Sequence, residues 1–242
     1  VIVIRETYPL GFDVRLDDFT RGKVTFLNRN VAGFGHEWDI SVPYNFEEYS
    51  YPGIGTRYAV RNIARTFSNL ELDFSDGLGS NTLGGLFSRA FISSDTKYAW
   101  SATARLTNTT EDLDTMLIPV PLRFTYQDYW VARSFLLDRA RVTRLIFSTR
   151  YINNNVFNRP EITGNDYYRL QKYQLFIGSI ALSTQKFINT SLIYSYGRTE
   201  DIPYGYLIEA NAGREINEFK WRTYFGASVA YGNIFNRFGY IY

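Results

Sequence analysis

One histidine and several groups of carboxylates are the residues in this sequence whose types could support catalysis or bind a metal. His36 directly follows a glycine-rich segment, and no serine nucleophile motif of the G-x-S-x-G type occurs. A histidine-based zinc site needs more histidines than this chain has. We therefore expect His36 to be a loop or interfacial residue and predict no catalytic residues. Esterase or deacylase activity that is lost in His36→Ala would instead indicate a lipid-active enzyme.

Clusters of carboxylates are candidate calcium ligands, because oxygen-rich loops can bind this ion. None of the clusters has the spacing of a defined calcium loop, so we interpret them as solvated turn residues. We predict neither a metal site nor a cofactor. The clusters are Asp17-Asp18, Glu111-Asp112-Asp114 and Glu200-Asp201.

Gly33 and Gly35 lie in a short glycine-rich segment that could be read as a phosphate-binding loop. No Lys-Ser/Thr pair follows them, and no helical pattern begins there, so the phosphate-loop motif is incomplete. We predict a hairpin turn between two strands.

Arginines recur on the polar faces of several expected strands. A ring of arginines can bias a pore toward anions. Pairing with aspartates and glutamates on the same faces would give them a structural role instead, and the sequence leaves both interpretations open. These arginines are Arg105, Arg144, Arg150 and Arg222.

The composition excludes several classes of protein. With a net charge of +2 over 242 residues, the chain has no strongly basic field, so we predict no nucleic-acid partner. The chain contains no cysteine, which excludes disulfide scaffolds and thiol chemistry. No apolar run approaches the ~20 residues of a transmembrane helix, so only a closed sheet could cross a membrane. Aromatic residues make up 18% of the chain, as is typical of membrane barrels and of tyrosine-rich β-sandwiches.

Period-two alternation is the dominant pattern and predicts β-strands. Its clearest example runs from Glu218 to Gly232, where the odd positions from Phe219 to Tyr231 are mostly apolar or aromatic. The even positions begin with charged residues and continue with small or polar ones. A membrane strand needs about 9–11 residues and an apolar side bounded by aromatics. This segment meets both requirements.

The same alternation recurs along the chain. Water-soluble sandwiches also alternate, because one face of each sheet packs on a core. Two features favour a membrane barrel: the apolar faces combine alanine with aromatics over long strands, and the polar faces carry charges in mid-strand, which a barrel interior can pair. The recurring segments are Trp38–Tyr44, Leu70–Phe74, Tyr98–Leu106, Leu145–Tyr151 and Tyr204–Ala212.

Turn-forming residues separate these segments. Pro119 and Pro121 mark an irregular start to a further strand. We predict turns or loops over Asp17–Gly22, Asp76–Gly85, Ser93–Asp95, Thr107–Asp114, Asn153–Asp166, Arg198–Pro203 and Asn233–Arg237.

Together these patterns predict an all-β fold, an antiparallel transmembrane β-barrel with about 12–14 strands. We expect residues 1–242 to form a single transmembrane β-barrel domain, either an incomplete barrel or a fragment of a longer chain. Phe238, Tyr240 and Tyr242 alternate at the C-terminus, as in the last strand of complete outer-membrane barrels or in an ordinary strand.

Several hairpins resemble those of the BamA-type superfamily of outer-membrane insertases and translocators. The segment Phe26–Gly35 (FLNRNVAGFG), followed by the alternating residues Trp38–Tyr44, resembles an early hairpin of these barrels. Similar hairpins are Gly55–Phe67 and Leu70–Asp76. The later segment Gly197–Gly205 resembles barrel segments of related proteins from Bacteroidetes-like bacteria.

This resemblance implies a barrel of about 16 strands preceded by periplasmic docking domains. The sequence shows neither in full, and it lacks the late Arg-Gly-Phe/Tyr loop motif of the superfamily, which counts against an insertase if the chain is complete. It resembles the larger, first part of such a barrel.

The resemblance also implies a location in the bacterial outer membrane and a non-catalytic function. A weakly paired seam would offer an unpaired strand edge on which a client strand is templated during insertion or export. We expect Val1–Tyr8 to form the first strand at that seam. The expected partners are membrane lipids and other outer-membrane or periplasmic proteins. A passive pore or small-solute transporter, and a structural subunit of an envelope complex, are the alternatives.

Overall fold

The computed structural model describes residues 8–93, 95–111, 119–162, 167–191, 199–235 and 239–241. They form an antiparallel sheet of 13 strands that follow one another in chain order. The expected all-β, antiparallel fold and the expected number of strands are therefore confirmed. A short 3-10 helix, η1 (Tyr168–Leu170), is the only helical element in this part of the chain. None of the described helical structure is long and apolar enough to cross a membrane.

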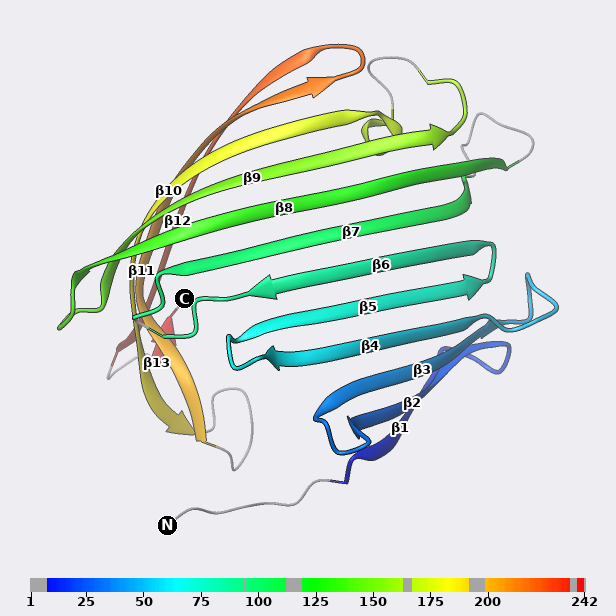
Figure 1. The fold of residues 1–242 in the computed structure, drawn as a ribbon, viewed down its shortest axis with the longest axis horizontal. Coiled ribbons are helices and arrows are strands. Elements are labelled where there is room, and N and C mark those ends of the chain that lie inside the picture. The colour runs from blue at the N-terminus through cyan, green and yellow to red at the C-terminus, as the bar shows by residue number, and fades with distance from the viewer. Residues whose placement is uncertain are drawn as a thin grey trace. The chain divides into compact units, whose positions relative to one another are not determined.

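Consecutive strands are hydrogen-bonded neighbours, and Figure 1 labels them in order. The strands are β1 (Leu10–Leu16), β2 (Arg21–Val31), β3 (His36–Asn45), β4 (Ile54–Ile63), β5 (Ser68–Gly77), β6 (Ser80–Arg89), β7 (Tyr98–Glu111), β8 (Val120–Asp138), β9 (Thr143–Asn158), β10 (Tyr173–Ser191), β11 (Thr199–Asn217), β12 (Trp221–Phe235) and β13 (Gly239–Ile241).

The chain divides into two compact units. The first unit comprises Val1–Arg89, Ser101–Asp128 and Asn153–Tyr173, and the second comprises Ala90–Trp100, Tyr129–Ile152 and Gln174–Tyr242. The long strands β7, β8 and β9 contribute residues to both units.

In the first unit, the strand register places most of the apolar residues of β1 to β6 on one face. Residues opposite each other in antiparallel strands share a face, as do residues two apart in one strand. Phe12 pairs with Phe26, Phe26 with Ile40, and Tyr58 with Leu72. Many of these side chains are exposed, and Phe12 is 80% accessible. The face comprises Leu10, Phe12, Val14, Leu16, Val24, Phe26, Trp38, Ile40, Val42, Tyr58, Val60, Leu70, Leu72, Phe74, Leu83 and Phe87.

In the second unit, β11 and β12 show the same division. Ile208 pairs with Val229, and Ala212 pairs with Phe225, so the predicted apolar positions of both strands share one face. Val229 and Phe225 are strongly exposed. Glu209 pairs with Ser228 on the opposite face. The predicted alternation of both segments is thus confirmed.

The tight turns between strands depend on left-handed backbone conformations. Between β2 and β3, Gly33 and Gly35 have φ angles of 83° and 71°, values that glycine adopts without the steric cost of a Cβ atom. The hairpin turn predicted for this segment is confirmed. Asp17 and Asp18 lie in the turn between β1 and β2, and Ser93 accepts a backbone hydrogen bond from Thr96 before β7.

Two predicted loops are wrong in part, because strands extend into them. Strand β7 runs on through Thr107–Glu111, and β9 runs on through Asn153–Asn158. The asparagines fit a strand because their amides have partners: Asn153 Nδ2 donates to Gln127 Oε1 at 3.0 Å, and Asn154 Nδ2 donates to the Gln171 carbonyl at 2.8 Å. Residues 112–114 and 163–166 of these predicted loops lie outside the described residues.

The predicted loop Asp76–Gly85 is also shorter than expected. Strand β5 continues to Gly77, and β6 begins at Ser80, so only two residues connect them. Gly84 lies within β6 opposite Asp73, and a Cβ atom on it would lie 2.6 Å from Asp73 Oδ1. This glycine therefore makes room for a neighbouring side chain and does not mark a turn.

Three further boundaries differ near the C-terminus. Strand β11 begins at Thr199, inside the predicted turn Arg198–Pro203, and β12 continues to Phe235, inside the predicted turn Asn233–Arg237. Strand β12 begins at Trp221 and not at Glu218. Asn217 explains this start, because its Oδ1 accepts from the Phe219 N–H and its own N–H donates to the Lys220 carbonyl. Residues 198, 236, 237, 238 and 242 lie outside the described residues.

The segment between β9 and β10 folds back onto the first unit. Leu170 in η1 is 1% exposed and packs with Leu122 and Val156 in a small apolar cluster. Arg159 Nη1 donates to the Leu170 carbonyl at 2.6 Å. This segment is thereby anchored to strands β8 and β9.

Candidate functional site

A network of ion pairs crosses β2, β3, β4 and β5 on the face opposite the apolar one. We name it the charge ladder: Arg29, Glu37, Asp39, Arg57, Arg61 and Glu71. Arg57 Nη2 lies 2.8 Å from Glu71 Oε2, and Arg57 Nη1 lies 3.2 Å from Asp39 Oδ2. Arg61 contacts both Glu71 and Glu37. The ladder side chains on β3 and β4 thus have partners on both neighbouring strands, whereas Glu71 on β5 pairs with two arginines of β4.

A further ion pair extends the ladder within the first unit. Arg105 on β7 lies 3.1 Å from Asp73 on β5, across the position of Gly84 on β6. Counting this pair, four guanidinium groups meet four carboxylates, so these eight residues together carry no net charge. Such neutral pairing stabilises charges on a sheet face and attracts neither anions nor cations.

The arginines singled out in the sequence have different surroundings. Arg105 is paired with Asp73, and Arg222 Nε lies 3.7 Å from Glu215 Oε1. Arg150 is an exposed residue of β9. Arg144 is half-buried and lines a hollow of the second unit. Pairing with a carboxylate is therefore established for Arg105 and Arg222.

His36 begins β3, as the position of the preceding turn predicts. Its Nδ1 lies 2.5 Å from the Tyr58 hydroxyl, and the two rings meet edge to face with centroids 5.6 Å apart. Phe34 contacts the same imidazole ring. The residues around His36 are thus aromatic, and its hydrogen bond joins two strands near a turn.

Of the three carboxylate clusters, Asp17-Asp18 lies in a turn as predicted, whereas Glu111 lies in β7 and Glu200-Asp201 lies in β11, so the turn assignment is wrong for these three residues. Asp18 Oδ1 accepts hydrogen bonds from the Thr20 hydroxyl and from the backbone N–H groups of Thr20 and Arg21. These hydrogen bonds lower the pKa of Asp18, with the Thr20 side chain as the largest cause. Asp112 and Asp114, and the side chains of Glu111, Glu200 and Asp201, lie outside the described part. Among the described residues, no three potential ligands converge on a metal site.

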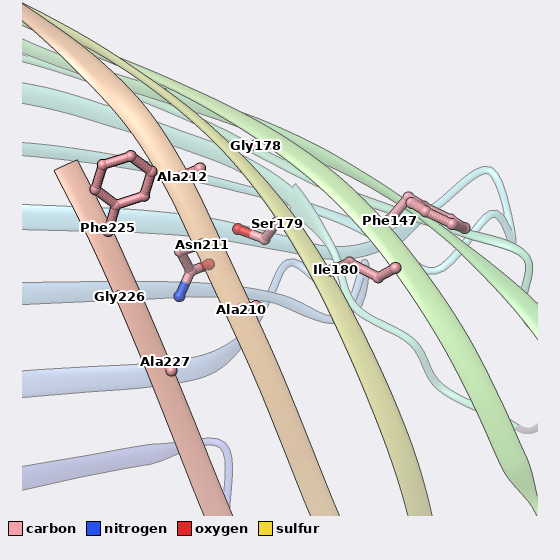
Figure 2. A pocket seen from close by; sticks show the side chains of 10 residues that line it. All are labelled: Phe147, Gly178, Ser179, Ile180, Ala210, Asn211, Ala212, Phe225, Gly226 and Ala227. Carbon is pink, nitrogen blue, oxygen red and sulfur yellow. The ribbon is translucent and has the colours of Figure 1, made fainter. Parts of the chain in front are cut away.

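The apolar face of the second unit contains a shallow groove of about 830 Å³. Figure 2 shows the rings of Phe225 and Phe147 on either side of smaller side chains. Because Ala210 pairs with Ala227, and Ala212 with Phe225, small residues of β11 and β12 meet on this face. Small side chains lower the surface, and the bulkier rings beside them form its walls. The lining residues are Phe147, Gly178, Ser179, Ile180, Ala210, Asn211, Ala212, Phe225, Gly226 and Ala227.

The structure has a free strand edge at β1, a position that the sequence analysis did not predict. In the described residues, β1 has one hydrogen-bonded neighbour, β2. The Arg29 N–H donates to the Pro9 carbonyl at 2.6 Å, and the Asp17 N–H donates to the Arg21 carbonyl at 3.0 Å. Bonded and non-bonded pairs alternate along an antiparallel ladder. The register therefore directs odd-numbered residues of β1 toward β2.

The even-numbered residues of β1 consequently direct their backbone N–H and C=O groups away from β2. These residues are Leu10, Phe12, Val14 and Leu16, which also carry the apolar face of the strand. Val1–Tyr8 was expected to be the first strand; residues 1–7 lie outside the described part, and the first described strand begins at Leu10.

Comparison with known protein families, with curated proteins and with solved structures found no match to this chain.

Proposed function

We propose that this chain is part of an outer-membrane β-barrel that assists the insertion or export of other proteins. The lipid bilayer would cover the apolar faces, and the charge ladder would face the barrel interior. Two observations support the membrane location: exposed apolar side chains are continuous over β1 to β6, and the opposite face carries paired charges. A water-soluble sheet would cover such a face with a second layer.

The free edge of β1 carries the proposed insertion function. It offers outward N–H and C=O groups on a strand with apolar residues on one face and Asp13 and Arg15 on the other. A client strand with the same alternation could add to this edge by main-chain hydrogen bonds. Its apolar side chains would then lie on the lipid side of the sheet.

A proline at Val14 tests this proposal. Val14 directs its N–H away from β2, so Val14→Pro removes a donor from the free edge and leaves the bonds between β1 and β2 in place. Val14→Ala is the matched control, because it shortens the side chain and keeps the N–H. The assay follows the folding of an eight-stranded outer-membrane barrel protein into liposomes that contain the chain.

We expect the wild-type chain and Val14→Ala to accelerate client folding and Val14→Pro to lose most of that acceleration. Equal rates for the two variants, or no acceleration by the wild type, would refute templating at β1. Gel mobility of unheated samples checks that each variant is itself folded.

A passive pore is the second candidate, because the charge ladder would suit a water-filled interior. Planar bilayers that contain the purified chain would then conduct ions, with little preference for anions given the balanced charges. Conductance in the absence of any effect on client folding would favour the pore.

A further inference from the structure

A hollow of about 550 Å³ in the second unit combines cationic, hydroxylic and apolar side chains. Strands β9, β10 and β11 and the segment before β7 contribute to it. Its size falls within the range of about 300–1,000 Å³ that is typical of small-molecule sites. The lining residues are Phe91, Ile92, Ser93, Val142, Arg144, Ile146, Ser183, Lys186, Phe187 and Tyr204.

Two cations and several hydroxyl groups give the hollow its polar part. Arg144 is half-buried on β9, and Lys186 lies on the neighbouring strand β10. Within the described residues, neither side chain has a carboxylate at ion-pair distance. The charge of Asp95 reaches Arg144, but Asp95 itself is paired with Arg139 at 3.3 Å.

A half-buried guanidinium is costly to hold without a hydrogen-bonded counter-charge. An arginine fork binds the planar oxygens of a carboxylate or the oxygens of a phosphate, and a lysine adds a point charge. Ser93 and Ser183 line the same space and can donate further hydrogen bonds to an anion. These residue types therefore suit one compact anionic group.

The apolar part of the lining makes a free inorganic anion a poor match. Ile146 follows Arg144 on the same face of β9, and Phe187 follows Lys186 on β10. Ile92 lines the same hollow. Apolar walls beside a pair of cations are suited to a ligand that has a charged head and a hydrocarbon body.

We propose that this hollow binds a single-chain anionic amphiphile. Arg144 and Lys186 hold its carboxylate or phosphate group, and Ile146 and Phe187 contact its chain. The proposal does not rest on strand templating at β1, which belongs to the first unit.

The test uses the full chain in neutral maltoside micelles with dansyl-undecanoic acid as a fluorescent probe. The signal is the emission in excess of protein-free micelles of equal detergent content. Laurate, dodecyl phosphate and dodecanol then compete for the probe. We expect the anionic competitors to displace it and dodecanol, which has the same chain and no charge, to fail.

Variants assign the binding to the hollow. Arg144→Gln/Lys186→Gln should weaken probe binding by about tenfold to a hundredfold, the range for loss of hydrogen bonds to a charged group. Arg144→Lys should retain much of the affinity. Arg141→Gln is the control, because it changes an exposed arginine that pairs with Asp138 and does not line the hollow.

The outcomes separate the possible ligands. Stronger competition by laurate identifies a fatty-acid-like carboxylate, and stronger competition by dodecyl phosphate identifies a lipid phosphate. Equal competition by dodecanol, or unchanged affinity in the double variant, would overturn the proposal. Ile146→Trp, which fills the hollow and keeps both cations, provides a second test and should also abolish probe binding.

Discussion

Arg57 on β4 and Glu71 on β5 form the central contact of the charge ladder, with Nη2 and Oε2 2.8 Å apart. Glu71 also accepts from Arg61 on the same strand as Arg57. One carboxylate therefore contacts two guanidinium groups that are partly withdrawn from solvent. This geometry makes Glu71 the residue on which the neighbouring arginines most depend.

Glu71→Gln should destabilise the folded chain, because Arg57 and Arg61 lose their shared charge partner. Since these side chains are about one-third accessible, we expect a loss of only about 1 kcal/mol in the free energy of unfolding. Urea unfolding of the chain in liposomes measures it. Asp13→Asn is the control, because the Asp13–Arg15 pair is mostly exposed and should contribute almost nothing. Equal losses in both variants would contradict a special role for Glu71.

Gly84→Ala should destabilise the chain by about 1–3 kcal/mol, the usual range for overpacking. Its new Cβ atom would lie 2.6 Å from Asp73 Oδ1 and displace that carboxylate from Arg105. Gly11→Ala is the control, since a Cβ atom there has no heavy atom within 4 Å. Denaturant midpoints of the two variants give the comparison, and an unchanged midpoint for Gly84→Ala would show that Asp73 can move freely.

Val229 and Ser228 are adjacent residues on opposite faces of β12, and they test which face meets lipid. The chain has no native cysteine, so Val229→Cys and Ser228→Cys each accept a single nitroxide label. In liposomes, we expect the label at position 229 to collide with dissolved oxygen and to be shielded from a nickel chelate. The label at position 228 should be less exposed to oxygen. The reverse pattern would place the polar face against lipid and reject the proposed orientation.

Acid should weaken the turn between β1 and β2. The pKa of Asp18 is lowered in the folded chain. Its hydrogen bonds from Thr20 and Arg21 therefore stabilise the turn fully at pH values above the ordinary aspartate pKa of 3.8. This contribution is lost as the pH falls through the lower folded pKa. The stability difference between wild type and Asp18→Ala should therefore be constant near neutral pH and shrink at acidic pH. A difference that stays constant down to pH values well below 3.8 would contradict this account.

Alternation alone was enough to predict most strands and their faces. Trp38–Tyr44 and Leu70–Phe74 lie in β3 and β5 with the expected apolar sides. Their ends were harder to predict because residues typical of turns have local partners inside strands. Asn154 and Gly84 show this: one satisfies backbone carbonyls of a folded-back segment, and the other makes room for Asp73.

The partners of the charges could not be read from the sequence, because they depend on strand register. Arg57 meets Asp39 because the two residues are opposite each other in the pairing of β3 with β4, and it meets Glu71 because the turn after Ile63 sets the pairing of β4 with β5. Arg144 was identified as a polar-face residue, but Lys186 was not. Phe187, the residue after Lys186, also lines the hollow, and strand alternation alone does not group adjacent residues in one site.

The direction of β1 has a geometric consequence for a strand that adds to its free edge. Strand β1 runs antiparallel to β2. An added strand that is antiparallel to β1 would therefore run in the same direction as β2 and continue the alternation of directions across the first unit, with hydrogen bonds perpendicular to the strands.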